Sequence, residues 1–272
     1  MSLSEVINVH RYDEPEWRAI HDDLYTYSQD KHVFATNGGE VYRKGWEWTQ
    51  CIYGLQKLGM LRPDAKALGV GAGRESIIFW LSDHINHVTA TDLYGNARWS
   101  LLNGAEASSK ILKNPQRFCD RKVDLSKITF QNADGTNLQY GRNQFDFCWS
   151  LSSIEHFGSH EASSQAVREM VRVTKPGGII CVTTEYLILP EHSHPEYFTK
   201  SEIEKYVIGA SPDASLVDGM DWTLPPHEYL LDQICFNSPG VHRRRRHVIL
   251  NDGNVQWTSF IIFLKKRDDS SV

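Results

Sequence analysis

Short apolar runs alternate with amphipathic stretches along the middle of this sequence. The apolar runs predict strands at Lys66–Val70, His87–Thr91, Ile128–Asn132, Phe145–Trp149 and Ile179–Glu185. Helical periodicity is found between them, at Glu75–Ser82, Ala97–Leu102 and Glu161–Thr174. Because strands that are separated by helices are typical of parallel sheets, we expect a doubly wound, mostly parallel α/β fold.

The two ends of the chain follow other patterns. Residues 45–61 predict an amphipathic helix. Residues 215–222 and 254–267 predict strands without a full crossover helix between them, and Asp252-Gly253 is a hairpin-turn dipeptide. We therefore expect a single domain with about seven strands that ends in an antiparallel hairpin. Its parts would be a helical cap over 1–64, a core over 65–186, and a cover with the terminal strands over 187–272.

Composition excludes several classes of protein. The 272 residues carry a net charge of -5, which argues against a nucleic-acid partner. No apolar run approaches the roughly 20 residues of a membrane span, and the N-terminus lacks the cationic start of a signal peptide. The five cysteines are scattered and form no CxxC motif. We therefore expect reduced thiols and a cytoplasmic protein.

The segment ALGVGAGRES, residues 67–76, carries three alternating glycines, Gly69, Gly71 and Gly73, directly after a predicted strand. Such a loop lets the backbone approach a nucleotide-like ligand, and the next helix offers free N–H groups. A dinucleotide loop of the GxGxxG type would have glycine at 74, where this chain has Arg74. The loop alone is weak evidence for any ligand.

Two carboxylates add to the glycine pattern. Asp92 ends the next predicted strand, about 20 residues after the glycines, where a carboxylate can accept both hydroxyls of a ribose. Asp134 follows the third strand and belongs to the same sheet edge. Two acids without an evident phosphate-binding pattern favour a nucleoside ligand that has no phosphates over NAD.

Five segments resemble, in order and spacing, the motifs of class I S-adenosylmethionine-dependent methyltransferases. They are ALGVGAGRE, TATDLYG, NADGTNL, FDFCWSLSSIEHFG and VREMVRVTKPGGIICVTTEY. The resemblance covers residues 66–186 and implies a Rossmann-like methyltransferase fold. It also implies S-adenosyl-L-methionine as cofactor and S-adenosyl-L-homocysteine as its product.

The resemblance assigns roles to individual residues. In that family the glycine loop packs on the methionine part of the cofactor. By resemblance, Asp92 binds ribose, Asp134 contacts adenine, and Ser150 with Leu151 lies near the sulfonium. The implied cofactor-binding residues are Gly69, Gly71, Gly73, Glu75, Asp92, Leu93, Asp134, Gly135, Thr136, Ser150 and Leu151.

A finer resemblance is to bacterial small-molecule O-methyltransferases that are found with glycan-building enzymes. It rests on Arg43–Trp48, Gly69–Glu75, Ala90–Leu93 and Trp257–Lys266. It implies methyl transfer to a hydroxyl of a small acceptor, a saccharide or glycan precursor. We expect residues 187–255 to cover the acceptor side. The alternatives are methylation of a quinone precursor or another natural product, and a non-catalytic protein that binds the cofactor.

His156 is the candidate general base, because it follows the fourth core strand and a neutral imidazole can accept a hydroxyl proton near pH 7. Glu155 would orient it or contact the acceptor. The alternative is a structural Glu-His pair that caps a helix or closes the loop.

We expect no metal. A related quinone-precursor methyltransferase family carries Glu-x-x-Glu-His at this place, and here Ser152 replaces the first acid. His192 and His194 could complete a site or line the acceptor pocket, but histidines two apart in a loop are more often polar surface.

Two further features are open to both a binding and a structural interpretation. The run HRRRRH, residues 242–247, could hold an anionic acceptor, or it could keep a sheet edge soluble. Aromatic residues of the N-terminal part could stack on a sugar or cover the cofactor, but we expect most of them to pack in the interior. They are Trp17, Tyr25, Tyr27, Trp46 and Trp48, and Trp46, together with Arg43, is the expected exception.

Overall fold

The computed structural model describes residues 2–34, 41–95, 107–189, 191–231, 233–235 and 246–268. Within these ranges, eleven strands pair in one sheet and two others pair in a second. The main sheet consists of β1 (Ser4–Val6), β3 (Lys66–Val70), β4 (His87–Asp92), β5 (Ile128–Asn132), β6 (Phe145–Leu151), β7 (Thr174–Leu187), β8 (Ala214–Leu216), β9 (Met220–Asp221), β10 (Ile234–Cys235), β12 (Leu250–Asn251) and β13 (Gln256–Lys266). The small sheet pairs β2 (Val41–Tyr42) with β11 (Arg246–His247).

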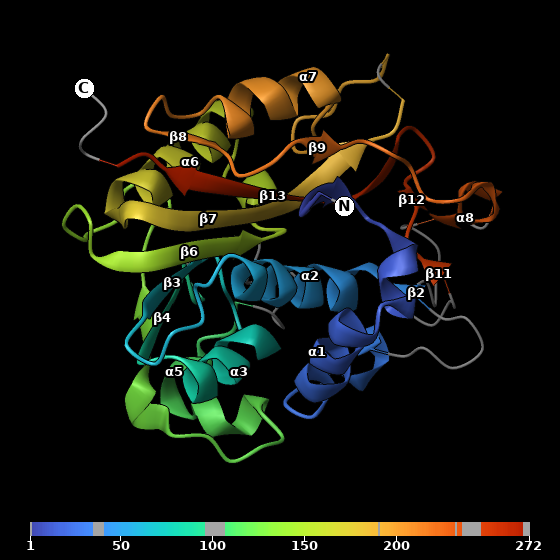
Figure 1. The fold of residues 1–272 in the computed structure, drawn as a ribbon. Helices are drawn as coiled ribbons and strands as arrows, with labels where there is room; N and C mark the ends of the chain where they lie inside the picture. Colours follow the sequence, from blue (N-terminus) through green and yellow to red (C-terminus); the bar gives the residue numbers. More distant parts are fainter. Residues whose placement is uncertain are drawn as a thin grey trace.

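Helices cover both faces of the main sheet (Figure 1). The α-helices are α1 (Pro15–Tyr25), α2 (Arg43–Lys57), α3 (Ser76–His84), α5 (Lys110–Lys113), α6 (His160–Val173), α7 (Lys200–Glu202) and α8 (His227–Leu231). A π-helical segment, Ile203–Ile208, continues α7. α6 and α7 lie on the other side of the sheet from α1 and α2 (Figure 1).

The strand order creates a switch point in the middle of the sheet. β5, β4, β3, β6 and β7 are parallel and lie side by side in that order. The chain therefore moves outward from β3 to β5 and then returns to β6 on the other side of β3. Loops that follow the carboxyl ends of such strands diverge, which opens a crevice for a ligand. The expected doubly wound α/β fold is confirmed.

The terminal strands differ in number from the prediction. β13 pairs antiparallel with β7 and forms the expected hairpin with β12, with Leu250 opposite Trp257. Gly253 of its turn has φ +96°. The expected count of seven strands is wrong, because short strands from both ends of the chain also pair with β13 or with one another. The segment 215–222 forms β8 and β9 rather than one strand, and the helix expected at 97–102 lies outside the described residues.

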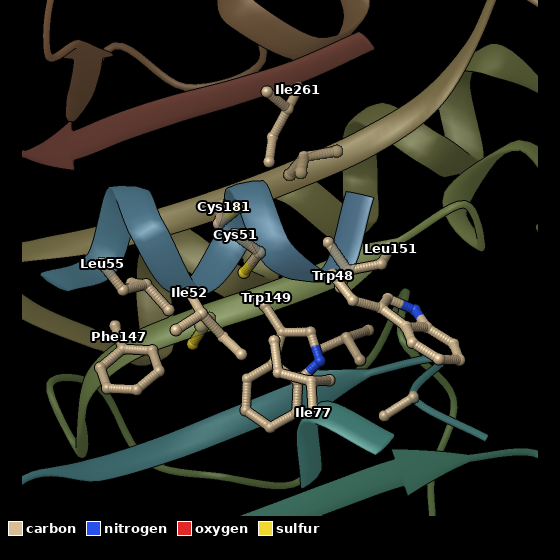
Figure 2. Packing of buried hydrophobic residues seen from close by; sticks show 14 of the residues in the cluster. Trp48, Cys51, Ile52, Leu55, Ile77, Phe147, Trp149, Leu151, Cys181 and Ile261 are labelled. Carbon is tan, nitrogen blue, oxygen red and sulfur yellow. The ribbon is translucent and has the colours of Figure 1, made fainter. Parts of the chain in front are cut away.

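The N-terminal part combines helices with strand pairing. β1 pairs with β13, so the region 1–64 is not purely a helical cap. α2 crosses the sheet over β6, β7 and β13. Figure 2 shows Cys51, Ile52 and Leu55 of α2 against Phe147 and Trp149 of β6. All five side chains are buried, so α2 is part of the same hydrophobic core as the sheet.

The packing of α2 on β13 requires a glycine at position 54. A Cβ atom built on Gly54 would overlap the ring of Phe263, which is fully buried. We expect Gly54→Ala to lower the free energy of unfolding by about 1–2 kcal/mol, because overpacking outweighs the better helix propensity of alanine. Chemical denaturation measures this change. Gly219→Ala is the control, since nothing lies within 4 Å of its Cβ, and equal stability of the two variants would contradict the expectation.

Candidate active site

A cavity of about 640 Å³ lies at the carboxyl ends of the parallel strands. Its wall has two parts. The loops after β3, β4, β5 and β6 form one part, with residues from 71–75, 92–93, 133–136 and 151–157. The N-terminal region forms the other, with Asp30, His32, Val33, Tyr42, Lys44 and Trp48. The cavity therefore lies between the core sheet and the segment that precedes it, beside the switch point.

The glycine loop is bonded to the end of β4. The hydroxyl of Thr91 donates to the carbonyl of Gly69 at 2.7 Å, and the N–H of Gly73 donates to the carboxylate of Asp92 at 2.9 Å. Gly71 and Gly73 have φ values of +65° and +48°, which favour glycine. A Cβ on Gly71 would lie 2.6 Å from Cβ of Ser153, so the loop after β6 also requires a glycine here.

The two predicted acids are held by neighbouring backbone groups. Asp92 also accepts from the N–H of Leu93 at 2.6 Å. Asp134 accepts from the N–H and the hydroxyl of Thr136, at 2.8 and 2.7 Å. Both carboxylates line the cavity from adjacent parallel strands, β4 and β5. Their orientation is therefore fixed by the local turns before any ligand contacts them.

Nine of the eleven residues assigned to the cofactor line this cavity, and Gly69 and Ser150 do not. Trp149 covers the site where a side chain on Gly69 would lie. Ser150 is fully buried, and Leu151, which follows it on β6, lines the cavity. Successive strand residues point to opposite faces, so Ser150 points away from the wall that Leu151 forms.

The expected exceptions among the aromatic residues are corrected by the structure. Trp46 is fully buried and Arg43 is ion-paired in the interior with Glu47 and Glu185, whereas Trp48 lines the cavity. Residues two apart on a helix lie on different faces. The sequence therefore pointed to the correct helix but to the wrong face.

Arg74 has a role that the glycine pattern did not reveal. It lines the cavity, and its guanidinium lies 3.5 Å from the carboxylate of Asp30 in the N-terminal part. It also lies over the ring of Phe118, 5.7 Å from the centroid. Arg74, which stands where a dinucleotide loop would have its third glycine, thus connects the two parts of the cavity wall.

A buried carboxylate contacts Ser152 and Lys44, two residues that line the cavity. Glu47 of α2 is fully buried and accepts hydrogen bonds from Arg43, Lys44, Ser152 and Ser259. Burial alone would raise its pKa, but the charges of Lys44 and Arg43 and the hydrogen bonds hold the pKa of Glu47 below its usual value. Glu47 is therefore ionised, and its two oxygens hold donors from α2, β13 and the loop after β6.

His156 lines the cavity, with its side chain one-third exposed. Its Nδ1 atom lies 3.4 Å from the carboxylate of Glu196. Burial would lower the pKa of His156, but this contact and the charges of Glu155, Glu196 and Glu185 outweigh burial and raise it. The two nitrogens of the ring are distinct, and Glu196 orients one of them.

Glu155, the other catalytic candidate, does not line the cavity. Its carboxylate is buried and accepts from the hydroxyl of Thr184 at 2.8 Å. Burial raises the pKa of Glu155 to about 7. The structure therefore places Glu196, not Glu155, in contact with His156, and sequence reasoning missed Glu196 because it lies 40 residues further along the chain.

His192 and His194 also lie outside the cavity wall. Nδ1 of His194 accepts from the N–H groups of Glu196 and Tyr197, at 3.1 Å each, and the ring stacks on Tyr197. His194 thus orders the turn that carries Glu196. Among the residues that the structure describes, no three His, Cys, Asp or Glu side chains are grouped as metal ligands. Within the same ranges, the helices are too short or too polar for a bilayer crossing.

Comparisons with known proteins bear on this cavity. A family model described as "Methyltransferase domain" matches residues 68–182. The ubiquinone/menaquinone biosynthesis C-methyltransferase UbiE of Bdellovibrio bacteriovorus is 39% identical over 72 residues, which are 26% of this chain and 28% of that protein. The matched region thus spans about a quarter of this curated relative.

Two solved structures share the fold at low sequence identity. The 4+2 cyclase SpnF has a TM-score of 0.55 and 14% identity, over 98% of this chain and 100% of that one. Phosphoethanolamine N-methyltransferase 2 of Haemonchus contortus, in complex with S-adenosyl-L-methionine, has a TM-score of 0.53 and 14% identity, over 97% of this chain and 61% of that one. Residues 68–182 therefore resemble a methyltransferase domain in sequence, and the chain has the Rossmann-like fold of class I S-adenosylmethionine-dependent methyltransferases.

Proposed function

We propose that this protein binds S-adenosyl-L-methionine in the cavity and transfers its methyl group to a small acceptor. The observation that carries the proposal is the placement of Asp92 and Asp134 on adjacent strand ends, beside the glycine loop and in one cavity. The family model covers the same segments. The phosphoethanolamine N-methyltransferase with this fold is a complex with the same cofactor.

The residues of the cavity fit this cofactor in size and charge. A volume of about 640 Å³ is within the range of roughly 300–1,000 Å³ in which proteins enclose small ligands. Glu75, Asp92 and Asp134 line it, and acids suit a ligand that carries a sulfonium and an ammonium group. Arg74 is paired with Asp30, which does not favour the phosphates of a dinucleotide.

For methyl transfer the protein must align the acceptor with the methyl group and remove the proton of the acceptor hydroxyl. When bound, S-adenosyl-L-methionine supplies a methyl group that is already activated by the positive charge on sulfur. The acceptor would lie between the N-terminal part of the wall, which contributes Lys44 and Trp48, and the loop after β6, which contributes Ser152 and His156. His156 would accept the proton of an acceptor hydroxyl, with Glu196 holding the ring.

The class of the acceptor is inferred from sequence resemblance. Transfer to a hydroxyl of a saccharide is the expectation from sequence resemblance, yet Arg43 and most of Trp257–Lys266 are buried in α2 and β13. Packing accounts for that part of the resemblance without a sugar. Methylation of a quinone precursor is the rival, since the curated relative UbiE is a C-methyltransferase. A non-methylating role is the other, since SpnF has this fold and is a cyclase.

Binding of the cofactor product is the test of the proposal. At about 100 times its dissociation constant, S-adenosyl-L-homocysteine should stabilise the native state by roughly 2.7 kcal/mol and raise the melting temperature. NAD is the parallel control and should leave it unchanged. A shift with NAD alone would overturn the proposal. A shift with the homocysteine compound justifies a screen of acceptors with labelled cofactor, including methylmannoside, methylrhamnoside and phenols.

Asp92 should contribute measurably to cofactor affinity. Because a hydrogen bond to a charged group contributes about 1.5–3 kcal/mol, Asp92→Asn should weaken binding of S-adenosyl-L-homocysteine by about tenfold or more. Titration calorimetry measures the dissociation constant. Asp124→Asn is the matched control, since Asp124 also accepts a backbone N–H from a nearby residue but lies outside the cavity. Equal losses in the two variants would contradict a role of Asp92 in binding.

The rate should depend on the protonation of His156. A general base acts in its neutral form, and contact with Glu196 raises the pKa of His156 above its usual 6.5. We therefore expect kcat to rise with pH through that raised pKa. Glu196→Gln should move the rising limb to lower pH, and His156→Ala should remove it, with a loss of about 10²-fold or more. Glu191→Gln, at an exposed position of the same segment, is the control. An unchanged profile in Glu196→Gln would argue against this pair.

A further inference from the structure

Ser152 has an unusual backbone conformation at the edge of the cavity. Its φ is +49°, and among the residues described in the structure the only other non-glycine residue with a positive φ is Asn143, at +61°. Side chains other than glycine rarely adopt this region, and such strain is retained where the surroundings impose it, often at functional sites. Ser152 directly follows β6, and its side chain lines the cavity.

Hydrogen bonds impose this conformation from two sides. The N–H of Ser152 donates to the carbonyl of Thr183 at 3.0 Å and to its hydroxyl at 2.9 Å. The hydroxyl of Ser152 donates to the carboxylate of Glu47 at 2.9 Å. A hydroxyl has one hydrogen, so the hydrogen of Ser152 is committed to Glu47. Its oxygen can therefore only accept further hydrogen bonds, one of them from the hydroxyl of Thr183 at 3.5 Å and another from a ligand in the cavity that Ser152 lines.

Glu47 determines the direction of the hydrogen bond that the Ser152 hydroxyl makes. The carboxylate is fully buried, ionised, and held by Arg43, Lys44 and Ser259 as well as by Ser152. An ionised carboxylate can only accept, so the Ser152 hydroxyl cannot turn around without leaving Glu47 one donor short. A hydroxyl that donates to a charged group is also a stronger acceptor at its own oxygen, because hydrogen bonds in a chain polarise one another.

We propose that Ser152 is a specificity-determining residue that accepts a hydrogen bond from the reacting hydroxyl of the acceptor, with Glu47 as its positioning residue. This inference rests on the proposed function and narrows the acceptor to a molecule with an O–H group at the methylated position. The acceptor oxygen forms the new O–CH3 bond as the S–CH3 bond breaks, and the electron pair of that bond goes to sulfur. As this bond forms, the proton of the acceptor hydroxyl gives up its hydrogen bond to Oγ of Ser152 and is transferred to the imidazole of His156, while the proton of Ser152 stays on Ser152 in its bond to Glu47.

The experiment compares two variants that separate stability from activity. Ser152→Gly relieves the backbone strain but also removes the donor to Glu47, so the two effects oppose each other; its melting temperature should change little, and it should bind S-adenosyl-L-homocysteine like the wild type. Its kcat should fall by about tenfold or more, the effect of one lost hydrogen bond to a polar partner. Ser152→Thr keeps the hydroxyl but adds a branched Cβ at positive φ, so it should melt earlier and retain most of the rate.

Asn143→Gly is the matched control, because it relieves the same kind of strain away from the cavity. Rates are measured with the acceptor that the wild type methylates in the screen, and the bond type of the product is determined by mass spectrometry and NMR. A Ser152→Gly enzyme with the wild-type rate, a rate that falls only in step with stability, or a product methylated on carbon or nitrogen would each overturn the inference. Failure of the proposed function is distinct, since the wild type itself would then bind no S-adenosyl-L-homocysteine.

Discussion

The buried carboxylate of Glu47 is the constraint on which the packing of α2 and the position of Ser152 at the cavity depend. A charge without water must be matched by donors, and Glu47 collects them from α2, from β13 and from the loop after β6. Arg43 extends the group to Glu185 on β7. The same bonds thus fix the helix on the sheet and orient Ser152 at the cavity. Stability of the N-terminal region and the shape of the site therefore have a common physical cause.

The two ends of the cavity differ in how they are built. The part around the glycine loop consists of turns whose backbone groups hold Asp92 and Asp134 in place over a few residues. The part around Ser152 and His156 is held by contacts between side chains that are far apart in the sequence, Glu47 with Ser152 and Glu196 with His156. Local turns need only a short sequence pattern, whereas the second kind of contact requires the whole sheet to be assembled first.

This difference explains what the sequence could predict. The five parallel strands and most of the residues around the glycine loop that line the cavity follow from alternation, glycine spacing and acids at strand ends, which are local signals. Trp48 and Glu196 could not be found in this way. Whether Trp46 or Trp48 faces the cavity depends on how α2 rotates against β6 and β13, and Glu196 reaches His156 only because the chain folds back after β7. The short strands that pair with β13 were not predicted as separate strands, because a strand of two or three residues carries no periodic pattern.

The matched segment contains the local turns but not both partners of the long-range contacts. The family model matches residues 68–182, which contain the glycine loop, both acids and Ser152. It does not reach Lys44, Glu47 and Trp48, nor Glu196, which lie on either side of the matched segment. A protein with the same core and a different N-terminal helix would keep the turns around the glycine loop and lose the contact that orients Ser152. The conformation of Ser152 therefore depends on a residue outside the matched segment as well as on its own place within it, and the buried Glu47–Ser152 hydrogen bond joins the two.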